Sequence, residues 1–317
     1  MHRLSHRSAD ELRKVTHGGR MAERTYALVT AAFNEEALIE QTIVSVLAQS
    51  HLPVRWIVVS DGSTDGTDAI VSRYAAQHDF LRLIRIGARH SRNFAAQVNA
   101  INAGFSELKG LPYDFIGNFD ADITILPDYF ERVLDLFDSD MRLGLAGGCI
   151  YEKYKNGDFR VRKTNSSRSV PHAVQLFRRE CFEQVQPYVP LLHGGPDSYA
   201  EVIARMKSWR VQSFSGLQVF HHRPTNSAGS LLRNCFRQGR MDYSLGYLPV
   251  YEAAKLLRRV PATPFFLGAL LRTAGFLYCY LIGEPHQAPP HFIGFLRREQ
   301  KELLQSSFHQ LIRRFAA

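Results

Sequence analysis

Two short acidic motifs in the first half of the chain have the residue types of a metal and nucleotide site. Asp120 and Asp122 flank one small residue directly after the apolar run 114–119. Hard divalent cations such as Mg²⁺ or Mn²⁺ take carboxylate oxygens together with the oxygens of a diphosphate. Asp61 opens an Asp-Gly-Ser turn, where its carboxylate could accept a hydrogen bond from a nucleobase or a ribose hydroxyl. Read alone, the first motif is weak because it has many chance matches at strand ends, and the second is better explained as a plain Asp-Gly turn.

The segments around these motifs predict alternating strands and helices. Strands are expected at the apolar runs 25–32, 56–60, 81–86 and 114–119, and helices at 36–47, after the turn at 61–67 and at 94–101. This alternation predicts an α/β fold with helices on both faces of a mostly parallel sheet. Ligands bind at the carboxyl ends of such strands. Asn34, Asp61 and the Asp120 to Asp122 turn each follow a strand, so we expect them at one edge of the sheet.

The segment after the two aspartates predicts a helix with a start of its own. Pro127 and Asp128 precede apolar residues at helical spacing, which include Phe130, Val133, Leu134 and Phe137. Asp120 and Asp122 are therefore not needed as the cap of that helix and stay at the strand end.

A second acidic cluster opens a helix predicted at 198–209, where Asp197 and Glu201 lie close together. Strands are predicted around Phe214 and Phe220, and the sequence His-His-Arg-Pro, residues 221–224, closes the last of them. A loop-like stretch follows. We place a domain boundary there, with a catalytic domain at 25–225 and a helical C-terminal region at 226–317.

The C-terminal region combines basic residues with a long apolar stretch. The chain of 317 residues has a net charge of +9, and most of the excess lies after residue 230. Residues 264–283 have about the length that spans a bilayer. Arg272 lies at the midpoint, where a charge costs about 2.5 kcal/mol or more. The pattern favours helices that lie on the cytoplasmic leaflet of a membrane, with helices packed onto the catalytic domain as the alternative.

The remaining composition fits a cytosolic setting. Four cysteines lie far apart without the close pairs of zinc or redox sites, so we expect reduced, mostly buried thiols. Residues 1–24 are basic and contain no apolar core segment, which predicts a disordered tail rather than a secretory signal peptide.

The four N-terminal motifs together resemble glycosyltransferase family 2, the nucleotide-sugar transferases with the GT-A fold. The resemblance covers roughly 25–224, and its motifs VTAAFNEEALIEQTIVSVLAQ, VVSDGSTDGT, QVNAINAG and FDADITILPDYFERVL stand in the order and spacing of the family. It implies a Rossmann-like, mixed and mostly parallel sheet. The best local analogy is a family subset whose catalytic domain ends in His-His-Arg-Pro.

The resemblance also implies a donor site at the matched positions. In the family, the residues matched by Ala32, Asn34 and Glu35 line the nucleoside, and the aspartate matched by Asp61 binds the base. By the same resemblance, Asp120 is expected to approach the ribose or the metal, and Asp122 to bind the metal. Many relatives have a lysine where Gln97 stands, so phosphate neutralisation is expected from Arg89 or Arg92, while Asn102 and Gly104 match.

The catalytic base is expected near the second acidic cluster. An inverting transferase needs a carboxylate near the acceptor hydroxyl, because an alcohol is a poor nucleophile until it loses its proton. Many relatives supply this group from a Glu-Asp pair, but the sequence here is GGPDSYAEVIAR. We predict Asp197 as the base, with Glu201 as the other candidate. The structural alternatives are an N-cap for Asp197 and a solvated first-turn acid for Glu201.

Two later motifs give further candidates. His221 could complete a metal shell or contact the diphosphate, or could be a buried structural histidine. FRQGRMDY, residues 236–243, faintly resembles the Q-x-x-R-W element of processive family members, but its glutamine and tryptophan are missing. This argues against processive polymer synthesis, although Arg240 suits contact with a diphosphate.

These features predict an inverting, metal-dependent glycosyltransferase that uses a nucleoside-diphosphate sugar and Mg²⁺ or Mn²⁺. We expect a saccharide or lipid-linked acceptor at the cytoplasmic face of the membrane, in envelope or exopolysaccharide synthesis. The alternatives are a nucleotidyltransferase acting on a sugar phosphate and a non-catalytic nucleotide-sugar-binding protein. No nucleic-acid-binding module is recognisable.

Overall fold

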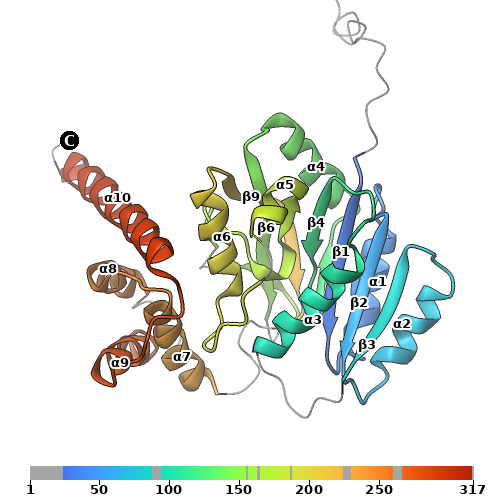
Figure 1. Ribbon diagram of the computed structural model, residues 1–317, viewed down its shortest axis with the longest axis horizontal. Coiled ribbons are helices and arrows are strands. Elements are labelled where there is room, and N and C mark those ends of the chain that lie inside the picture. The colour runs from blue at the N-terminus through green and yellow to red at the C-terminus, as the bar shows by residue number, and fades with distance from the viewer. Residues whose placement is uncertain are drawn as a thin grey trace, which may run out of the picture.

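The computed structural model describes residues 24–87, 94–154, 156–162, 165–185, 188–223, 230–259 and 266–315. A mixed sheet forms its centre, and the strands run in the order β3-β2-β1-β4-β8-β6-β9-β5, with β7 paired to β6 (Figure 1). The strands are β1 Tyr26–Ala32, β2 Arg55–Asp61, β3 Leu81–Ile86, β4 Phe115–Asn118, β5 Ile123–Ile125, β6 Leu143–Lys153, β7 Phe159–Val161, β8 Leu176–Arg178 and β9 Arg210–His221.

The first four strands are parallel neighbours, as the sequence predicts. β1 pairs in parallel with both β2 and β4, and β2 pairs in parallel with β3. The second half of the sheet is mixed, because β8 is antiparallel to β4 and β6, whereas β9 is parallel to β6. The predicted mixed sheet flanked by helices is confirmed. The two strands predicted around Phe214 and Phe220 are one continuous strand, β9.

Helices cover both faces of the sheet. One buried apolar cluster joins the sheet to α1 Ile39–Leu47, α2 Thr67–Ala75 and α4 Tyr129–Ser139. A second cluster on the other face joins it to α3 Phe94–Glu107, α5 Arg179–Val185 and α6 Pro196–Met206. Three predicted helix starts shift: α1 begins at Ile39 after a turn at 36–38, α4 begins at Tyr129, directly after Pro127 and Asp128, and α6 begins at Pro196 rather than at residue 198.

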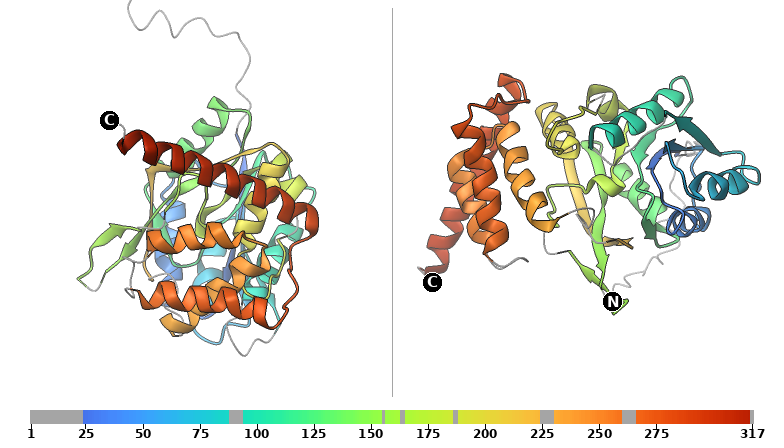
Figure 2. Two further views of the ribbon diagram at one scale, coloured as in Figure 1. Left: turned by 90° about the vertical axis from the view of Figure 1, so that its left-hand side faces the viewer. Right: turned by 90° about the horizontal axis from the view of Figure 1, so that it is seen from below.

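Four helices follow the sheet and group at one end of the molecule (Figure 2). They are α7 Leu231–Ser244, α8 Pro249–Arg259, α9 Leu267–Leu281 and α10 Pro290–Phe315, called the helical bundle below. The bundle contacts the sheet half of the molecule through a small apolar cluster with α6, where the Tyr199 and Phe292 rings stack with centroids 4.6 Å apart. The alternative in which these helices pack onto the catalytic domain is thus part of the structure.

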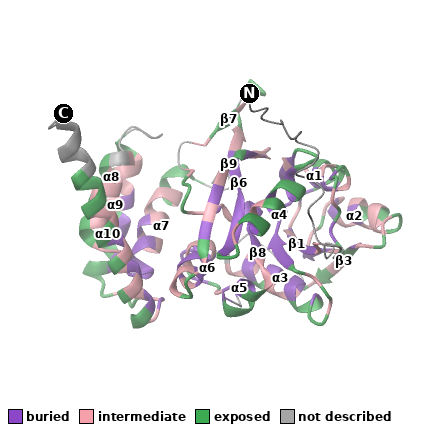
Figure 3. Ribbon diagram, turned by 90° about the horizontal axis from the view of Figure 1, so that it is seen from above, coloured by how far each residue is buried: buried purple, intermediate pink, exposed green. Residues whose placement is uncertain are grey.

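Arg272 explains the interruption in the apolar stretch 264–283. Arg272 is only 4% exposed and its side chain lies inside the helical bundle, where Nε donates to Asp242 at 2.8 Å and to Glu252 at 3.1 Å. No helix in the described ranges is long and apolar enough to cross a membrane. Burial is concentrated in the strands and in the helix sides that face them, and much of α10 is exposed (Figure 3).

All four cysteines are free, and Cys149, Cys181 and Cys279 are buried, as predicted.

Candidate active site

The turn from Asp120 to Asp122 lies between β4 and β5, at the carboxyl edge of the parallel strands. The backbone N–H of Phe119 donates to the Val29 carbonyl of β1 at 2.9 Å, which continues the sheet beyond β4. On the α1 side, the buried Thr42 hydroxyl lies 2.9 Å from the carbonyl oxygens of both Ala121 and Ile123. The turn is therefore fixed by the sheet and by α1 together, with both carboxylates left at its rim.

β9 brings His221 to this turn. The antiparallel pairing of β5 with β9 places Ile123 opposite His221, and the N–H of His222 donates to the Asp122 carbonyl at 3.0 Å. The His221 Nε2 lies 3.1 Å from Asp122 Oδ1. Burial acts to lower the pKa of His221, but the Asp122 carboxylate outweighs it and raises the pKa above its ordinary value. The structure thus brings these two predicted metal ligands into contact.

Arg223 connects the same carboxylate to the loop after β1. Its Nη1 donates to Glu35 Oε1 at 3.0 Å and lies 3.6 Å from Asp122 Oδ2. Our sequence reasoning gave Arg223 no role, although the His-His-Arg-Pro motif was the available signal. The Arg223 guanidinium now links the predicted nucleoside loop to the predicted metal ligand.

The loops after β1 and β2 are joined by side-chain to backbone hydrogen bonds. Asn34 has a φ of 54°, in the left-handed region that asparagine tolerates better than most residues. Its Oδ1 accepts from the Thr64 N–H at 2.8 Å, and the Glu35 N–H donates to the Thr67 hydroxyl at 2.7 Å. These bonds hold the Asn34–Glu35 loop beside the turn that carries Asp61.

Ala32 and Asp61 end neighbouring parallel strands. Ala32 lies opposite Ser60 in the register of β1 and β2, and both Ala32 and Asp61 are buried. The predicted nucleoside residues therefore converge on the carboxyl edge that also carries Asp122.

A histidine that the sequence gave no reason to select lies beside Asp120. His172 Nδ1 is 3.6 Å from Asp120 Oδ1, and its buried Nε2 has no hydrogen-bond partner among the described residues. Burial acts to lower the pKa of His172, but Asp120 and, more weakly, Asp197 raise it overall. Asp197 thus lies close enough to His172, beside Asp120, to raise the pKa of that histidine.

Asp197 and Glu201 occupy different environments on α6. Glu201 is 4% exposed, and its Oε1 accepts from the Ser169 hydroxyl at 2.9 Å and the Val170 N–H at 2.7 Å. The interpretation of Glu201 as a solvated acid is wrong, because its carboxylate ties α6 to the 169–170 segment. The interpretation of Asp197 as an N-cap is also wrong, since Gly195 holds that position. Asp197 is half-buried in the first turn.

The comparison with known families identifies this arrangement. The family model of glycosyl transferase family 2 matches residues 27–197, more than half of the chain. The chain belongs to glycosyltransferase family 2. The predicted family is thus confirmed, whereas the subset with the His-His-Arg-Pro ending stays a prediction.

Relatives with known names support this family assignment. Glycosyltransferase AglE of Haloferax volcanii is 24% identical over 301 residues, which cover 90% of each chain. The poly-beta-1,6-N-acetyl-D-glucosamine synthase of Staphylococcus aureus is 30% identical over 118 residues, 37% of this chain and 26% of that protein. The structure of the mannosyltransferase PcManGT from Pyrobaculum calidifontis matches with a TM-score of 0.53 and 16% identity, over 92% of this chain and 81% of that one. This structural likeness confirms the GT-A fold.

The family 2 site offers two protein ligands to a cation. Within the described ranges, no group of three or more His, Cys, Asp or Glu side chains could hold a metal ion by itself. Asp122 and His221 instead present an oxygen and a nitrogen 3.1 Å apart. This donor pair fits a divalent cation that takes its other ligands from a diphosphate and water, as Mg²⁺ commonly does.

Two predicted donor-binding residues have structural partners. The Asn102 amide donates to the Tyr188 carbonyl at 2.8 Å and accepts from the Tyr188 N–H at 3.2 Å. The Arg240 Nη2 lies 3.0 Å from Glu284 in the helical bundle. Contact of either residue with the donor therefore loses support from the geometry. Arg89 and Arg92 lie outside the described residues.

Gly104 has a packing reason for its match to the family. A Cβ at this position would lie 2.4 Å from Cγ1 of Val29, so a glycine lets α3 approach β1 closely.

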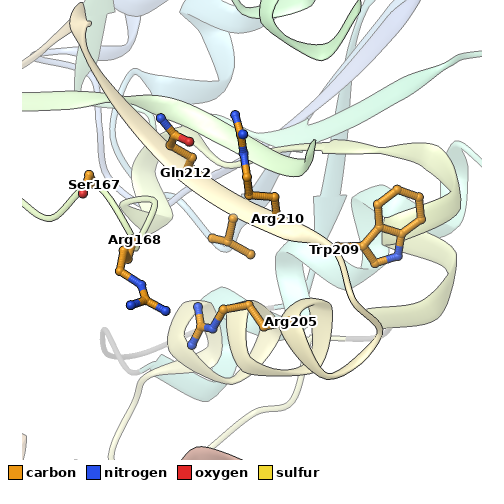
Figure 4. Close-up of a pocket in the computed structure, with 7 residues that line it drawn as sticks. Ser167, Arg168, Arg205, Trp209, Arg210 and Gln212 are labelled. Atoms are coloured by element: carbon orange, nitrogen blue, oxygen red, sulfur yellow. The ribbon is translucent and has the colours of Figure 1, made fainter. Parts of the chain in front are cut away.

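A hollow of about 360 Å³ near the start of β9 is separate from this site (Figure 4). It is lined by Ser167, Arg168, Arg205, Trp209, Arg210, Val211 and Gln212. Arg205 pairs with Glu299 at 2.8 Å and Arg210 with Asp140 at 2.9 Å. The hollow lies at the opposite end of β9 from His221.

Proposed function

We propose that the protein is an inverting glycosyltransferase that moves a sugar from a nucleoside-diphosphate sugar to a saccharide or lipid-linked acceptor. The observation that carries this proposal is the contact of Asp122 with His221 at the carboxyl edge of the sheet, 3.1 Å apart. That edge also carries the Asn34–Glu35 loop and Asp61, the positions that bind the nucleoside in the family. PcManGT, a fold neighbour, was solved with GDP-Man and Mn²⁺, a donor and a cation of the proposed kinds.

The donor lies across the rim in this proposal. Asp61 and the Asn34–Glu35 loop would hold the nucleoside, while Asp122 and His221 would hold Mg²⁺ or Mn²⁺, with Asp120 beside them. A bound cation would offset negative charge on the departing diphosphate. Arg223 already bonds to Glu35 and lies beside Asp122, so it can turn toward the diphosphate without a large movement.

Asp197 is the proposed base. The acceptor hydroxyl oxygen attacks the anomeric carbon, its proton passes to Asp197, and the bond from that carbon to the diphosphate oxygen breaks. Attack on the face opposite the leaving group inverts the anomeric configuration. Glu201 is the weaker candidate because it is buried and its Oε1 accepts two hydrogen bonds.

A donor panel tests this function. Purified protein is mixed with UDP, GDP, dTDP and CMP sugars, with and without Mn²⁺, and both binding and donor hydrolysis are measured. We expect Mn²⁺-dependent binding and slow hydrolysis of one nucleoside-diphosphate sugar, lost in Asp122→Ala. Binding without turnover on any acceptor would favour a non-catalytic binding protein, and no binding at all would reject the proposal.

The base assignment is tested by two variants of the same chemical kind. Asp197→Asn and Glu201→Gln each replace a carboxylate by an amide, and donor hydrolysis is measured at saturating donor. We expect a loss of about 10²- to 10⁴-fold in kcat for Asp197→Asn and a small change for Glu201→Gln. The reverse result would transfer the role to Glu201.

We also propose that the helical bundle associates with the cytoplasmic face of a membrane, where a lipid-linked acceptor of envelope or exopolysaccharide synthesis would be presented. One side of α9 exposes leucines at helical spacing: Leu267 is 43% exposed, Leu270 65%, Leu277 51% and Leu281 85%. Exposed apolar side chains in a row commonly mark a contact surface. The excess positive charge of the C-terminal region suits anionic lipid.

Vesicle flotation tests this association. The protein is mixed with phosphatidylcholine vesicles that contain phosphatidylglycerol, and the floating fraction is measured. We expect Leu270→Ser with Leu277→Ser to lower that fraction strongly, whereas Met141→Ser, at a residue 69% exposed on the catalytic half, leaves it unchanged. Equal floating fractions for the double leucine variant and Met141→Ser would reject α9 as the membrane contact.

A further inference from the structure

The segment from Leu191 to Gly195 delivers Asp197 to the site. Gly194 and Gly195 follow each other with φ of 87° and 89°, a backbone conformation that favours glycine. α6 begins immediately afterwards, at Pro196, with Asp197 in its first turn. The position of the Asp197 carboxylate therefore depends on how this segment, called the base loop below, is held.

The helical bundle supplies hydrogen bonds to the base loop. The N–H of Leu192 donates to Gln287 Oε1 at 2.8 Å, and the His193 carbonyl accepts from Arg237 Nη1 at 2.6 Å. His193 is 5% exposed, and its Nε2 lies 2.7 Å from Glu284 Oε1. Two successive residues of the base loop are thus fixed by side chains of the bundle and its connections.

Glu284 joins this contact to two further helices. Its carboxylate lies 3.0 Å from Arg240 Nη2 on α7 and accepts from Cys279 Sγ on α9 at 2.9 Å. Burial acts to raise the pKa of Glu284, but the donors from Cys279, His193 and Arg240 lower it to about 2. Glu284 is therefore ionised at neutral pH and accepts the His193 N–H.

The FRQGRMDY element faces the base loop. Arg237 bonds to the His193 carbonyl, and Arg240 bonds to Glu284, which in turn contacts the His193 ring. Met241 packs so closely that a Cβ on Gly195 would lie 2.9 Å from its Sδ. Arg237, Arg240 and Met241 occupy the three fixed positions of the Q-x-x-R-W element, although only Arg240 matches in type, and all three act on the base loop.

We infer that Glu284 is a positioning residue for Asp197, and that the helical bundle sets the catalytic geometry by holding the base loop through the Glu284–His193 contact. This inference rests on the proposed function, in which Asp197 is the base. The edge of the sheet that carries Asp61, Asp122 and the Asn34–Glu35 loop, called the donor rim below, lies on other elements. Loss of the Glu284–His193 contact therefore leaves donor binding intact and slows turnover. Group transfer is sensitive to such displacement, because an error of about 1 Å can cost about 10²-fold in rate.

Glu284→Gln tests the inference by removing the charge with little change of shape. The readout is Mn²⁺-dependent hydrolysis of GDP-mannose or UDP-N-acetylglucosamine, whichever the protein binds, with water as acceptor. We expect kcat to fall about 10- to 100-fold while donor KM and donor affinity stay within about twofold. Glu302→Gln, the same change at an exposed residue of α10, is the matched control and keeps full activity.

A second variant separates positioning from folding. His193→Gln keeps a side-chain N–H that can reach Glu284 and is expected to retain more activity than His193→Ala. The folded fraction of every variant is measured by donor-induced thermal shift, and kcat is expressed per folded molecule.

Three outcomes would overturn the inference. Unchanged kcat in Glu284→Gln, with Asp197→Asn inactive, rejects the inference alone. A parallel loss of donor affinity and kcat in Glu284→Gln indicates a general structural defect and also rejects it. Full activity of Asp197→Asn rejects the base assignment and, with it, the positioning role.

Discussion

Two acidic pairs in this chain differ in exposure and in the groups that compensate their charge. Asp120 and Asp122 lie at the rim of the sheet with side chains 24% and 12% exposed, whereas Asp242 and Glu252 lie inside the helical bundle with side chains 1% and 3% exposed. Both pairs concentrate negative charge, which is costly unless cations compensate it. The difference lies in where the compensating charge comes from.

The bundle supplies its own cations. Lys255 Nζ lies 2.9 Å from Asp242 and 3.4 Å from Glu252, and Arg272 contacts the same two carboxylates. Burial acts to raise the pKa of Asp242, but Arg272 and Lys255 lower it overall. Two acids and two bases form a closed set that connects α7, α8 and α9.

The carboxylates at the rim have partners that are shared with other groups or charged only when protonated. Arg223 is 3.6 Å from Asp122 and is shared with Glu35, and the His221 imidazole carries a charge only when protonated. A ligand cation can therefore add to the rim, while the bundle has no such need. We interpret an acidic pair as a ligand site when its partners are shared with other groups or are charged only when protonated, as Arg223 and His221 are here.

Removal of one buried cation from the charge set in the helical bundle is expected to have the largest effect on stability. Arg272→Met leaves Asp242 and Glu252 with Lys255 alone, and loss of one partner from a buried ion pair costs about 3–5 kcal/mol. The free energy of unfolding in urea measures this change. Arg298→Met on the exposed side of α10 is the control and should change it by less than about 0.5 kcal/mol.

Donor affinity is the second quantity to measure in Arg272→Met. Because the donor rim lies on other elements, the folded fraction should bind donor and Mn²⁺ normally. Impaired binding by folded Arg272→Met would mean that the two acidic regions are not independent.

Asp122→Asn tests the open rim. The amide cannot replace a carboxylate ligand, so Mn²⁺-dependent donor hydrolysis should fall by about 10²- to 10³-fold. Because the partners of Asp122 are an imidazole and a guanidinium that is shared with Glu35, the melting temperature should move by only a few degrees. A large stability loss with activity retained would reverse the comparison and make Asp122 structural.

The crossing of α7 and α9 offers a smaller test of the bundle. A Cβ on Gly275 would lie 2.0 Å from the Phe236 carbonyl oxygen, and one on Gly239 would lie 1.9 Å from that of Arg272. Gly275→Ala should destabilise the protein by about 1–3 kcal/mol through overpacking, measured by urea unfolding. Gly294→Ala on α10, where a Cβ meets nothing within 4 Å, should instead stabilise it by about 0.5–1 kcal/mol.

Glu201 supplies a test that depends on pH. Burial, with a contribution from the charge of Asp197, raises its pKa from 4.5 to about 8. The folded protein therefore holds a proton that the unfolded chain releases. The stability that this proton contributes is fully present below about pH 4.5 and is lost as pH rises through about 8.

Glu201→Gln removes this titration. Relative to the parent protein, the variant should gain about 1 kcal/mol or more in unfolding free energy between about pH 5.5 and pH 8. Urea unfolding at both pH values measures the difference, with Glu302→Gln as control. Parallel pH profiles for variant and parent would show that Glu201 does not titrate in this range.

The sequence predicted those features that depend on a short stretch of chain, namely the strands and the side chains that follow them. The first four strands follow apolar runs, and the positions of Asp61, Asp120 and Asp122 follow from the carboxyl ends of parallel strands. His172 and Arg223 could not be found this way, because their contacts depend on the pairing of distant strands and on the turn at 172–174. Glu284 was missed for the same reason: nothing in its neighbourhood of the sequence points to His193.

The contact of β9 with the rim also has a consequence for the order of folding. Asp122 and His221 are 99 positions apart in the chain, and Glu35 and Arg223 are 188 apart. Contacts of such long range form late, because the intervening chain loses much conformational freedom when they close. A chain truncated at residue 197 would include the whole family match and Asp122 but lack His221 and Arg223. If the proposed function holds, Mn²⁺-dependent donor binding should therefore report the final docking of β9 during refolding, after the first parallel strands have already paired.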